Sequence, residues 1–129
     1  ESLSARHPHL RLVGTLDEEL MPALVRRASL AAIFSRSEGF SLPVLEAMAA
    51  GVPVVVASGT VQEDTAGGFA RSVDPHRASE AAGAMEEALL ESSTGSERLE
   101  AAATFAKSHT WARCGEALTE SWRAILETR

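Results

Sequence analysis

Glu38 and Glu46 stand on either side of a short turn, with seven residues between them. Carboxylates accept hydrogen bonds from sugar and ribose hydroxyls, and a pair of them can also serve as acid and base in glycoside hydrolysis. Residues 39–42 follow Glu38 and lead into a helical pattern, and the free amides at a helix N-terminus favour an anion such as phosphate. The spacing therefore indicates a ligand that carries both hydroxyl groups and phosphate.

The elements that would hold these residues form one βαβ unit. Residues 30–34 and 52–57 are continuous apolar runs, which are typical of strands covered on both faces of a parallel sheet. Residues 42–50 have helical spacing, with Pro43 in the first turn and Gly51 directly after the last turn. The turn before this helix then lies at the carboxyl edge of the sheet, where open α/β sheets bind ligands.

Helix geometry gives the side chain of Glu46 a direction. Glu46 lies about one turn into the predicted helix, and helical side chains lean toward the N-terminus, so its carboxylate can reach over the turn. Beside a phosphate, it would bind hydroxyls of a sugar or ribose rather than the anion itself. Two simpler interpretations stay open: Glu46 as a solvated residue favoured by the helix dipole, and Glu38 as a loop charge paired with Arg36.

The whole string from Ser37 to Val55 resembles the donor-binding signature of retaining glycosyltransferases with the GT-B fold, especially glycosyltransferase family 4. The resemblance implies an α/β fold, with a Rossmann-like parallel sheet flanked by helices. It also implies transfer of a hexose, with retention, from a UDP-, GDP- or ADP-sugar to an acceptor, without a cofactor or an obligatory metal.

The resemblance assigns roles to individual residues. Glu38 would be the catalytic-site residue that binds the donor-sugar hydroxyls, and Glu46 would hold the ribose hydroxyls. The residues whose backbone would meet the sugar and the diphosphate are Gly39, Phe40, Ser41 and Leu42.

The resemblance extends over most of the chain. Residues 10–16 resemble a strand that ends in a glycine turn, and residues 17–28 resemble the next helix, with a capping-box pattern at residues 15–18. Leu20, Leu24 and Ala28 would face the sheet. Residues 57–64 resemble a glycine-rich turn and a short helix, with Gln62 where a proline is usual, and residues 70–75 resemble the last strand.

Two parts of the family pattern have no match in this sequence. One is an earlier strand–helix–strand segment that carries an Arg/Lys pair for the diphosphate, and the other is the N-terminal domain that binds the acceptor. We therefore expect residues 1–129 to be a single partial domain, the donor-nucleotide-sugar-binding portion of a GT-B C-terminal domain with its C-terminal helices. Its expected partners are the nucleotide diphosphate sugar and the missing N-terminal part of the same protein, and the uncovered sheet edge would be open to self-association.

Two other functions remain as alternatives. The chain could be a noncatalytic nucleotide-binding or regulatory α/β module, because the diphosphate clamp is missing. A glycoside hydrolase with Glu38 and Glu46 as its carboxylate pair ranks last, because a carboxylate beside an anion-favouring helix N-terminus has its pKa lowered, whereas an acid needs a raised pKa.

The C-terminal half has the apolar spacing of helices. Residues 76–91 would bury Ala78, Ala81, Met85 and Leu89, and residues 92–96 would separate them from a helix that buries Leu99, Ala103 and Ala106. Thr110 would cap the last helix. An apolar stripe on that helix predicts core packing and consists of Trp111, Cys114, Leu118, Trp122 and Ile125.

Composition excludes several classes of protein. A net charge of −6 disfavours nucleic-acid binding, and no apolar run is long enough to span a bilayer. The four histidines lack the neighbouring ligands that a metal site needs. A single cysteine cannot form an internal disulfide, so the expected location is the cytoplasm, with peripheral membrane association of the complete enzyme left open.

Overall fold

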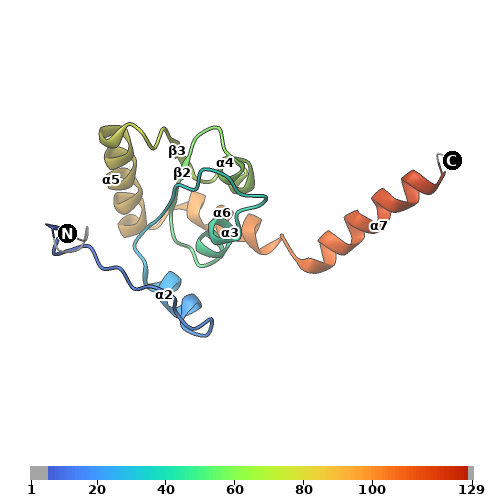
Figure 1. Ribbon diagram of the computed structural model, residues 1–129, viewed down its shortest axis with the longest axis horizontal. Coiled ribbons are helices and arrows are strands. Elements are labelled where there is room, and N and C mark those ends of the chain that lie inside the picture. The colour runs from blue at the N-terminus through green and yellow to red at the C-terminus, as the bar shows by residue number, and fades with distance from the viewer. Residues whose placement is uncertain (1–5, 128–129) are drawn as a thin grey trace.

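The computed structural model describes residues 6–127 and contains a three-stranded parallel sheet (Figure 1). Its strands are β1 (Ala31–Ile33), β2 (Val54–Ala57) and β3 (Arg71–Val73), in the spatial order β1-β2-β3. Ile33 pairs with Val56, and Ala57 pairs with Val73, so the carboxyl ends of all three strands meet at one edge. The predicted α/β fold, a Rossmann-like parallel sheet flanked by helices, is confirmed.

Helices cover both faces of this sheet. The helices that pack on the sheet or on one another are α2 (Met21–Arg27), α3 (Leu42–Ala49), α4 (Val61–Ala66), α5 (Ala78–Thr94) and α6 (Glu97–Lys107), and α7 (Trp111–Glu127) follows them along the chain. Helix α3 packs against α6, α4 and α2, and α5 packs against β2 and β3. Because side chains alternate along a strand, Val54 and Val56 join the cluster around α3, and Val55 points to the face that α5 covers.

Helix α3 is fixed at both ends by its sequence. Pro43 occupies the first turn, where a missing amide hydrogen costs no helical bond. At the other end, Gly51 adopts a φ of 76°, and two bonds close the helix: Gly51 N donates to Met48 O, and Val52 N donates to Ala47 O. This Schellman arrangement turns the chain directly into β2.

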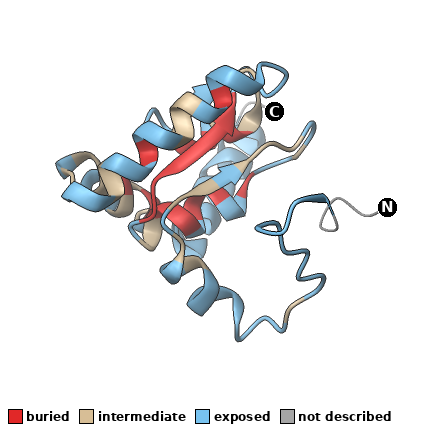
Figure 2. Ribbon diagram, turned by 90° about the vertical axis from the view of Figure 1, so that its left-hand side faces the viewer, coloured by how far each residue is buried: buried red, intermediate tan, exposed pale blue. Residues whose placement is uncertain are grey.

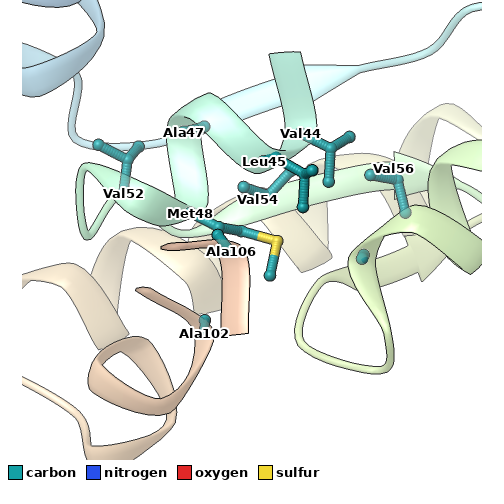
Figure 3. Close-up of a cluster of buried hydrophobic side chains, with 10 residues drawn as sticks. Val44, Leu45, Ala47, Met48, Val52, Val54, Val56, Ala102 and Ala106 are labelled. Carbon is teal, nitrogen blue, oxygen red and sulfur yellow. The ribbon is translucent and has the colours of Figure 1, made fainter. Parts of the chain in front are cut away.

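The core lies between α3, β2, α4 and α6 (Figures 2 and 3). Strand β2 is buried along its whole length, and Met48 extends from α3 toward Ala102 and Ala106 of α6. The two alanines let α6 approach α3 closely, and Met48 fills the space between them. This packing holds the first turn of α3 rigidly against the end of the sheet.

The N-terminal predictions need correction. Residues 10–16 form no strand, and they extend away from the sheet, so their backbone groups have no neighbouring strand to bond (Figure 1). Helix α2 begins at Met21 rather than near Asp17, and the expected capping box at residues 15–18 caps no helix. Leu24 is about half exposed, as is Leu20, which precedes the helix, and the core contacts on this side come from Val25 and Ala28.

The buried faces of α5 and α6 also differ in part from the prediction. Helix α5 continues through Thr94 and breaks only at Gly95. Ala81 is buried as predicted, but Ala88 takes the second buried position, and Leu89 is exposed. In α6 the buried residues are Ala102 and Ala106, because α6 faces the alanine-rich side of α3.

Helix α7 overturns the predicted core packing of its apolar stripe. Thr110 caps the helix as expected, since Arg113 N donates to its hydroxyl. However, none of the described residues of α7 is buried, and the helix projects away from the sheet (Figure 1). Trp111 is 83% exposed and Trp122 is 63% exposed, and the lone cysteine, Cys114, is exposed as well. The periodicity predicted the helix correctly, but the described chain offers no surface that covers it.

Because the apolar face of α7 is exposed, removing a large side chain from it should change the stability of the chain only slightly. Trp122→Ala should change the free energy of unfolding of the chain by less than about 0.5 kcal/mol, because the side chain has no packing to lose. Met48→Ala, the control, should cost about 2–5 kcal/mol because it leaves a cavity in the core. Urea unfolding followed by circular dichroism measures both, and a loss of about 3 kcal/mol for Trp122→Ala would mean that α7 is packed.

Candidate functional site

The candidate site is the loop that joins β1 to α3. It leaves the sheet after Ile33 and enters the helix at Leu42, so it lies at the carboxyl edge of the sheet. This is the position that the sequence predicted, and it is where ligands of open parallel sheets bind. Phe40 and Leu42 are each about half exposed on this loop, and Gly39 is exposed with open space around its Cα.

Ser41 is the innermost residue of the loop. It is completely buried at the N-cap position of α3, yet its hydroxyl caps no amide of the helix. Its Oγ has no hydrogen-bond partner among the described residues. A buried hydroxyl without a partner costs free energy, so such groups often belong to functional sites.

Within residues 6–127, Glu38 also has a buried polar atom without a hydrogen-bond partner, and here the side chain is charged. Its carboxylate is half-buried, and Oε2 is buried without a hydrogen-bond partner in the described part of the chain. The nearby Ser35 hydroxyl, and after it the Ser41 hydroxyl, lower the pKa of Glu38, partial burial raises it, and the Gln62 amide lowers it further, although none of these groups forms a hydrogen bond with Oε2. The lowering groups prevail, so Glu38 is an ionised acceptor at neutral pH. No ion pair with Arg36 is present within residues 6–127, which removes the simpler interpretation of Glu38.

Glu46 lies on the other side of α3 from Glu38. It is exposed, and its side chain lines two adjoining grooves between α2 and α3, with volumes of about 610 and 360 Å³. Glu38 instead lies among Ser35, Ser41 and Gln62, toward β2 and α4. The two carboxylates therefore flank the start of α3 from opposite sides, and neither groove is lined by Glu38.

The grooves beside Glu46 are lined mostly by apolar side chains, and each also has one arginine in its lining. Their volumes fall in the range of small-molecule sites. Arg26 lines the larger groove, and Arg27 lines the smaller one. Met21 and Val25 line both grooves. Both arginines lie in the last turn of α2, where basic side chains complement the helix dipole. Their position beside Glu46 depends on how α2 packs on α3, which the sequence pattern does not encode.

A second side chain that the sequence did not assign is Gln62. It is fully buried in the first turn of α4, where it contacts the ends of β1 and β2. The only signal in the sequence was a polar residue in place of the usual proline.

Two kinds of site find no support in the part of the chain that the structure describes. No three His, Cys, Asp or Glu side chains gather there as they would around a metal ion. No helix there is both long and apolar enough to cross a membrane.

Comparison with known proteins gives one family. The model of the family described as "Glycosyl transferases group 1" matches residues 5–108 of this chain. The match includes the β1–α3 loop, both glutamates and every element from α2 to α6. A search of curated proteins gives no match.

Proposed function

Because the chain belongs to the group 1 glycosyltransferases, which use nucleotide-sugar donors, we propose that residues 1–129 are the donor-binding portion of such an enzyme. The complete enzyme transfers a hexose from a UDP-, GDP- or ADP-sugar to an acceptor, with retention, in a GT-B arrangement. The observation that carries the proposal is the ionised Glu38 carboxylate, whose Oε2 lacks a partner beside the start of α3.

The donor sugar is assigned to Glu38. An ionised carboxylate with an unused lone pair accepts hydrogen bonds from hydroxyl groups, and those bonds are stronger than neutral ones. Glu38 is the only member of the loop that combines a charge with a buried, unpaired oxygen in residues 6–127. A sugar hydroxyl at this point would supply the missing donor.

The diphosphate is assigned to the loop backbone and the first turn of α3. Gly39 leaves open space in which a ligand can approach the main chain, and the loop leads into the N-terminus of α3, where the helix dipole favours an anion. Backbone amides and the helix dipole stabilise the charge that develops on a departing diphosphate. The residues assigned to this contact are Gly39, Phe40, Ser41 and Leu42.

The ribose is assigned to Glu46. Its side chain is exposed and lines two grooves between α2 and α3. Within residues 6–127 it forms no ion pair. A diol bound there would place the nucleoside in the grooves and the sugar at Glu38, on the opposite side of the helix start.

The placement of the two glutamates argues against the carboxylate-pair hydrolase, because Glu38 lines neither of the grooves that Glu46 lines. A glycoside hydrolase needs both carboxyl groups at one glycosidic bond, one as the protonated acid and the other as the ionised base or nucleophile. The noncatalytic binding module shares the same site, and turnover by a longer protein that contains this chain distinguishes it from an enzyme.

Two matched substitutions test the assignments. Glu46→Gln should weaken both a free nucleoside diphosphate and its sugar derivative by about 1.5 kcal/mol, roughly tenfold, because both ligands carry the ribose. Glu38→Gln should leave the free nucleotide nearly unaffected and weaken only the sugar derivative, since a residue that contacts only the sugar cannot affect a ligand that lacks it. Calorimetry or ligand-detected NMR on the 129-residue chain gives the four affinities.

Glu86→Gln, on the exposed face of α5, is the control for loss of one negative charge. It should change neither affinity. Equal losses of free-nucleotide affinity for the Glu38 and Glu46 variants, or no loss for either with the sugar derivative, would overturn the assignments.

A further inference from the structure

Gln62 joins the ends of two strands at the candidate site. Its Nε2 donates to the carbonyl oxygen of Ser35 at 3.1 Å, and its Oε1 accepts from the amide of Ala57 at 3.4 Å. Ser35 follows β1, and Ala57 is the last residue of β2. The side chain thus continues the link between these strands at the point where their backbone ladder ends, beyond the pairing of Ile33 with Val56.

The amide of Gln62 also acts on Glu38, which lies in the loop that follows Ser35. A primary amide has two N–H donors, and the bond to Ser35 uses one of them. The other remains available on a fully buried side chain, and the Gln62 amide is among the groups that lower the pKa of Glu38. The groups that act on this pKa are Ser35, Ser41 and Gln62, and none of the three carries a charge.

Ser35 and Glu38 belong to the same loop, so the bond from Gln62 to Ser35 fixes the loop close to Glu38. Burial of Gln62 prevents water from replacing its bonds to Ser35 and Ala57. We propose that Gln62 is a positioning residue for Glu38: its buried amide ties β1 to β2 and holds the Glu38 carboxylate in the orientation that the donor sugar requires. The part of this inference that concerns the sugar rests on the proposed function above.

The test replaces Gln62 by methionine, which has nearly the same shape and no amide. Carbon-detected NMR titration of the carboxyl groups should then show a raised pKa for Glu38. Glu63, the next residue of α4, is an internal reference because its own carboxylate accepts from Gly59 N, and its pKa should not move. Thr65→Val, which removes a buried polar group from the same helix, controls for a general change in the packing of α4 and should leave Glu38 unaffected.

Gln62→Asn keeps the amide but shortens its reach, and it tests the same contact if the methionine variant does not fold. It should raise the pKa of Glu38 in the same direction. In calorimetry, each folded variant should bind a nucleoside diphosphate as the unmodified chain does and lose about five- to tenfold in affinity for the sugar derivative.

The two measurements separate the possible failures. An unchanged Glu38 pKa in both variants, with only a lower unfolding temperature, would reduce Gln62 to a structural residue and overturn the proposal. If the unmodified chain binds no nucleotide but the Glu38 pKa still rises in the variants, the positioning of Glu38 stands and the proposed function fails.

Discussion

Gly67→Ala should destabilise the chain by about 2–5 kcal/mol, one of the largest effects expected of a single added methyl group. Gly67 ends α4 with a φ of 58°, where an alanine is strained by about 1–2 kcal/mol. An added Cβ would also lie 2.4 Å from Cζ of Phe105. Overpacking of this kind costs about 1–3 kcal/mol more.

The Phe105 ring cannot simply move aside. Its centroid lies 5.2 Å from the ring of Phe69 and 4.6 Å from that of His109, so any shift weakens both contacts. Phe105 also belongs to α6, which packs on α3 and hence supports the core behind the candidate site.

Gly68→Ala is the matched control for Gly67→Ala. Gly68 has a φ of 84° but nothing within 4 Å of its added Cβ, so only the backbone strain of about 1–2 kcal/mol remains. Urea unfolding of both variants measures the difference. Combining Gly67→Ala with Phe105→Ala should recover part of the loss, and equal losses at the two glycines would show that the ring contact contributes nothing.

Glu91→Gln should destabilise the chain by about 2–3 kcal/mol at pH 7, and the difference from the unmodified chain should disappear as the pH falls toward 2. Arg98 donates two hydrogen bonds to the Glu91 carboxylate, at 2.6 and 2.8 Å. Ser96 donates another, and Arg71 forms an ion pair with the same carboxylate. The Glu91 side chain is only 10% exposed. The hydrogen bonds from Arg98 are the main cause that lowers the pKa of Glu91 from 4.5 to about 2.

The direction of the pH effect follows from this lowered pKa. The unfolded chain binds a proton at Glu91 near pH 4.5, whereas the folded chain resists protonation down to about pH 2. The stabilisation is therefore complete above pH 4.5 and is lost as the pH falls through this interval. A shift of this size corresponds to at most about 3 kcal/mol, and exposure of about a third of the Arg98 side chain reduces it somewhat.

Glu80→Gln provides the control on the same helix. Glu80 pairs with Arg77 at 2.8 Å, but both side chains are at least half exposed, so its loss should cost less than about 0.5 kcal/mol at any pH. Denaturant unfolding from pH 7 to pH 2 follows all three proteins. If the difference in unfolding free energy between Glu91→Gln and the unmodified chain stays constant down to pH 2, the lowered pKa of Glu91 is wrong.

The sequence predicted the βαβ unit well because its signals are local. The apolar run at β2, the proline in the first turn of α3 and Gly51 each act within a few residues, and each has the predicted role in the structure. The position of Glu38 in the loop after β1 and of Glu46 one turn into α3 follows directly from these elements.

Predictions that depended on a partner surface were less successful. The strand at residues 10–16 needed a neighbouring strand, and the stripe on α7 needed a covering surface, and neither is present in the described chain. Amphipathic spacing indicates that a face is suited to burial, but it does not say against what. The role of Gln62 was missed for the same reason, because its bonds reach 27 residues back along the chain to Ser35.

We propose that a nucleotide sugar binds at the start of α3, and NMR mapping of the amide groups locates such a ligand. The isotopically labelled 129-residue chain is titrated with UDP, GDP and ADP, and then with their sugar derivatives, to about 10 mM, well above the 1 mM Kd that corresponds to about −4 kcal/mol. We expect amide shifts to concentrate at residues 39–42 and 46 for one of the nucleotides, and its sugar derivative should add changes at Glu38. Shifts centred on α6 or α7, or no shifts with any of the six ligands, would contradict this proposal.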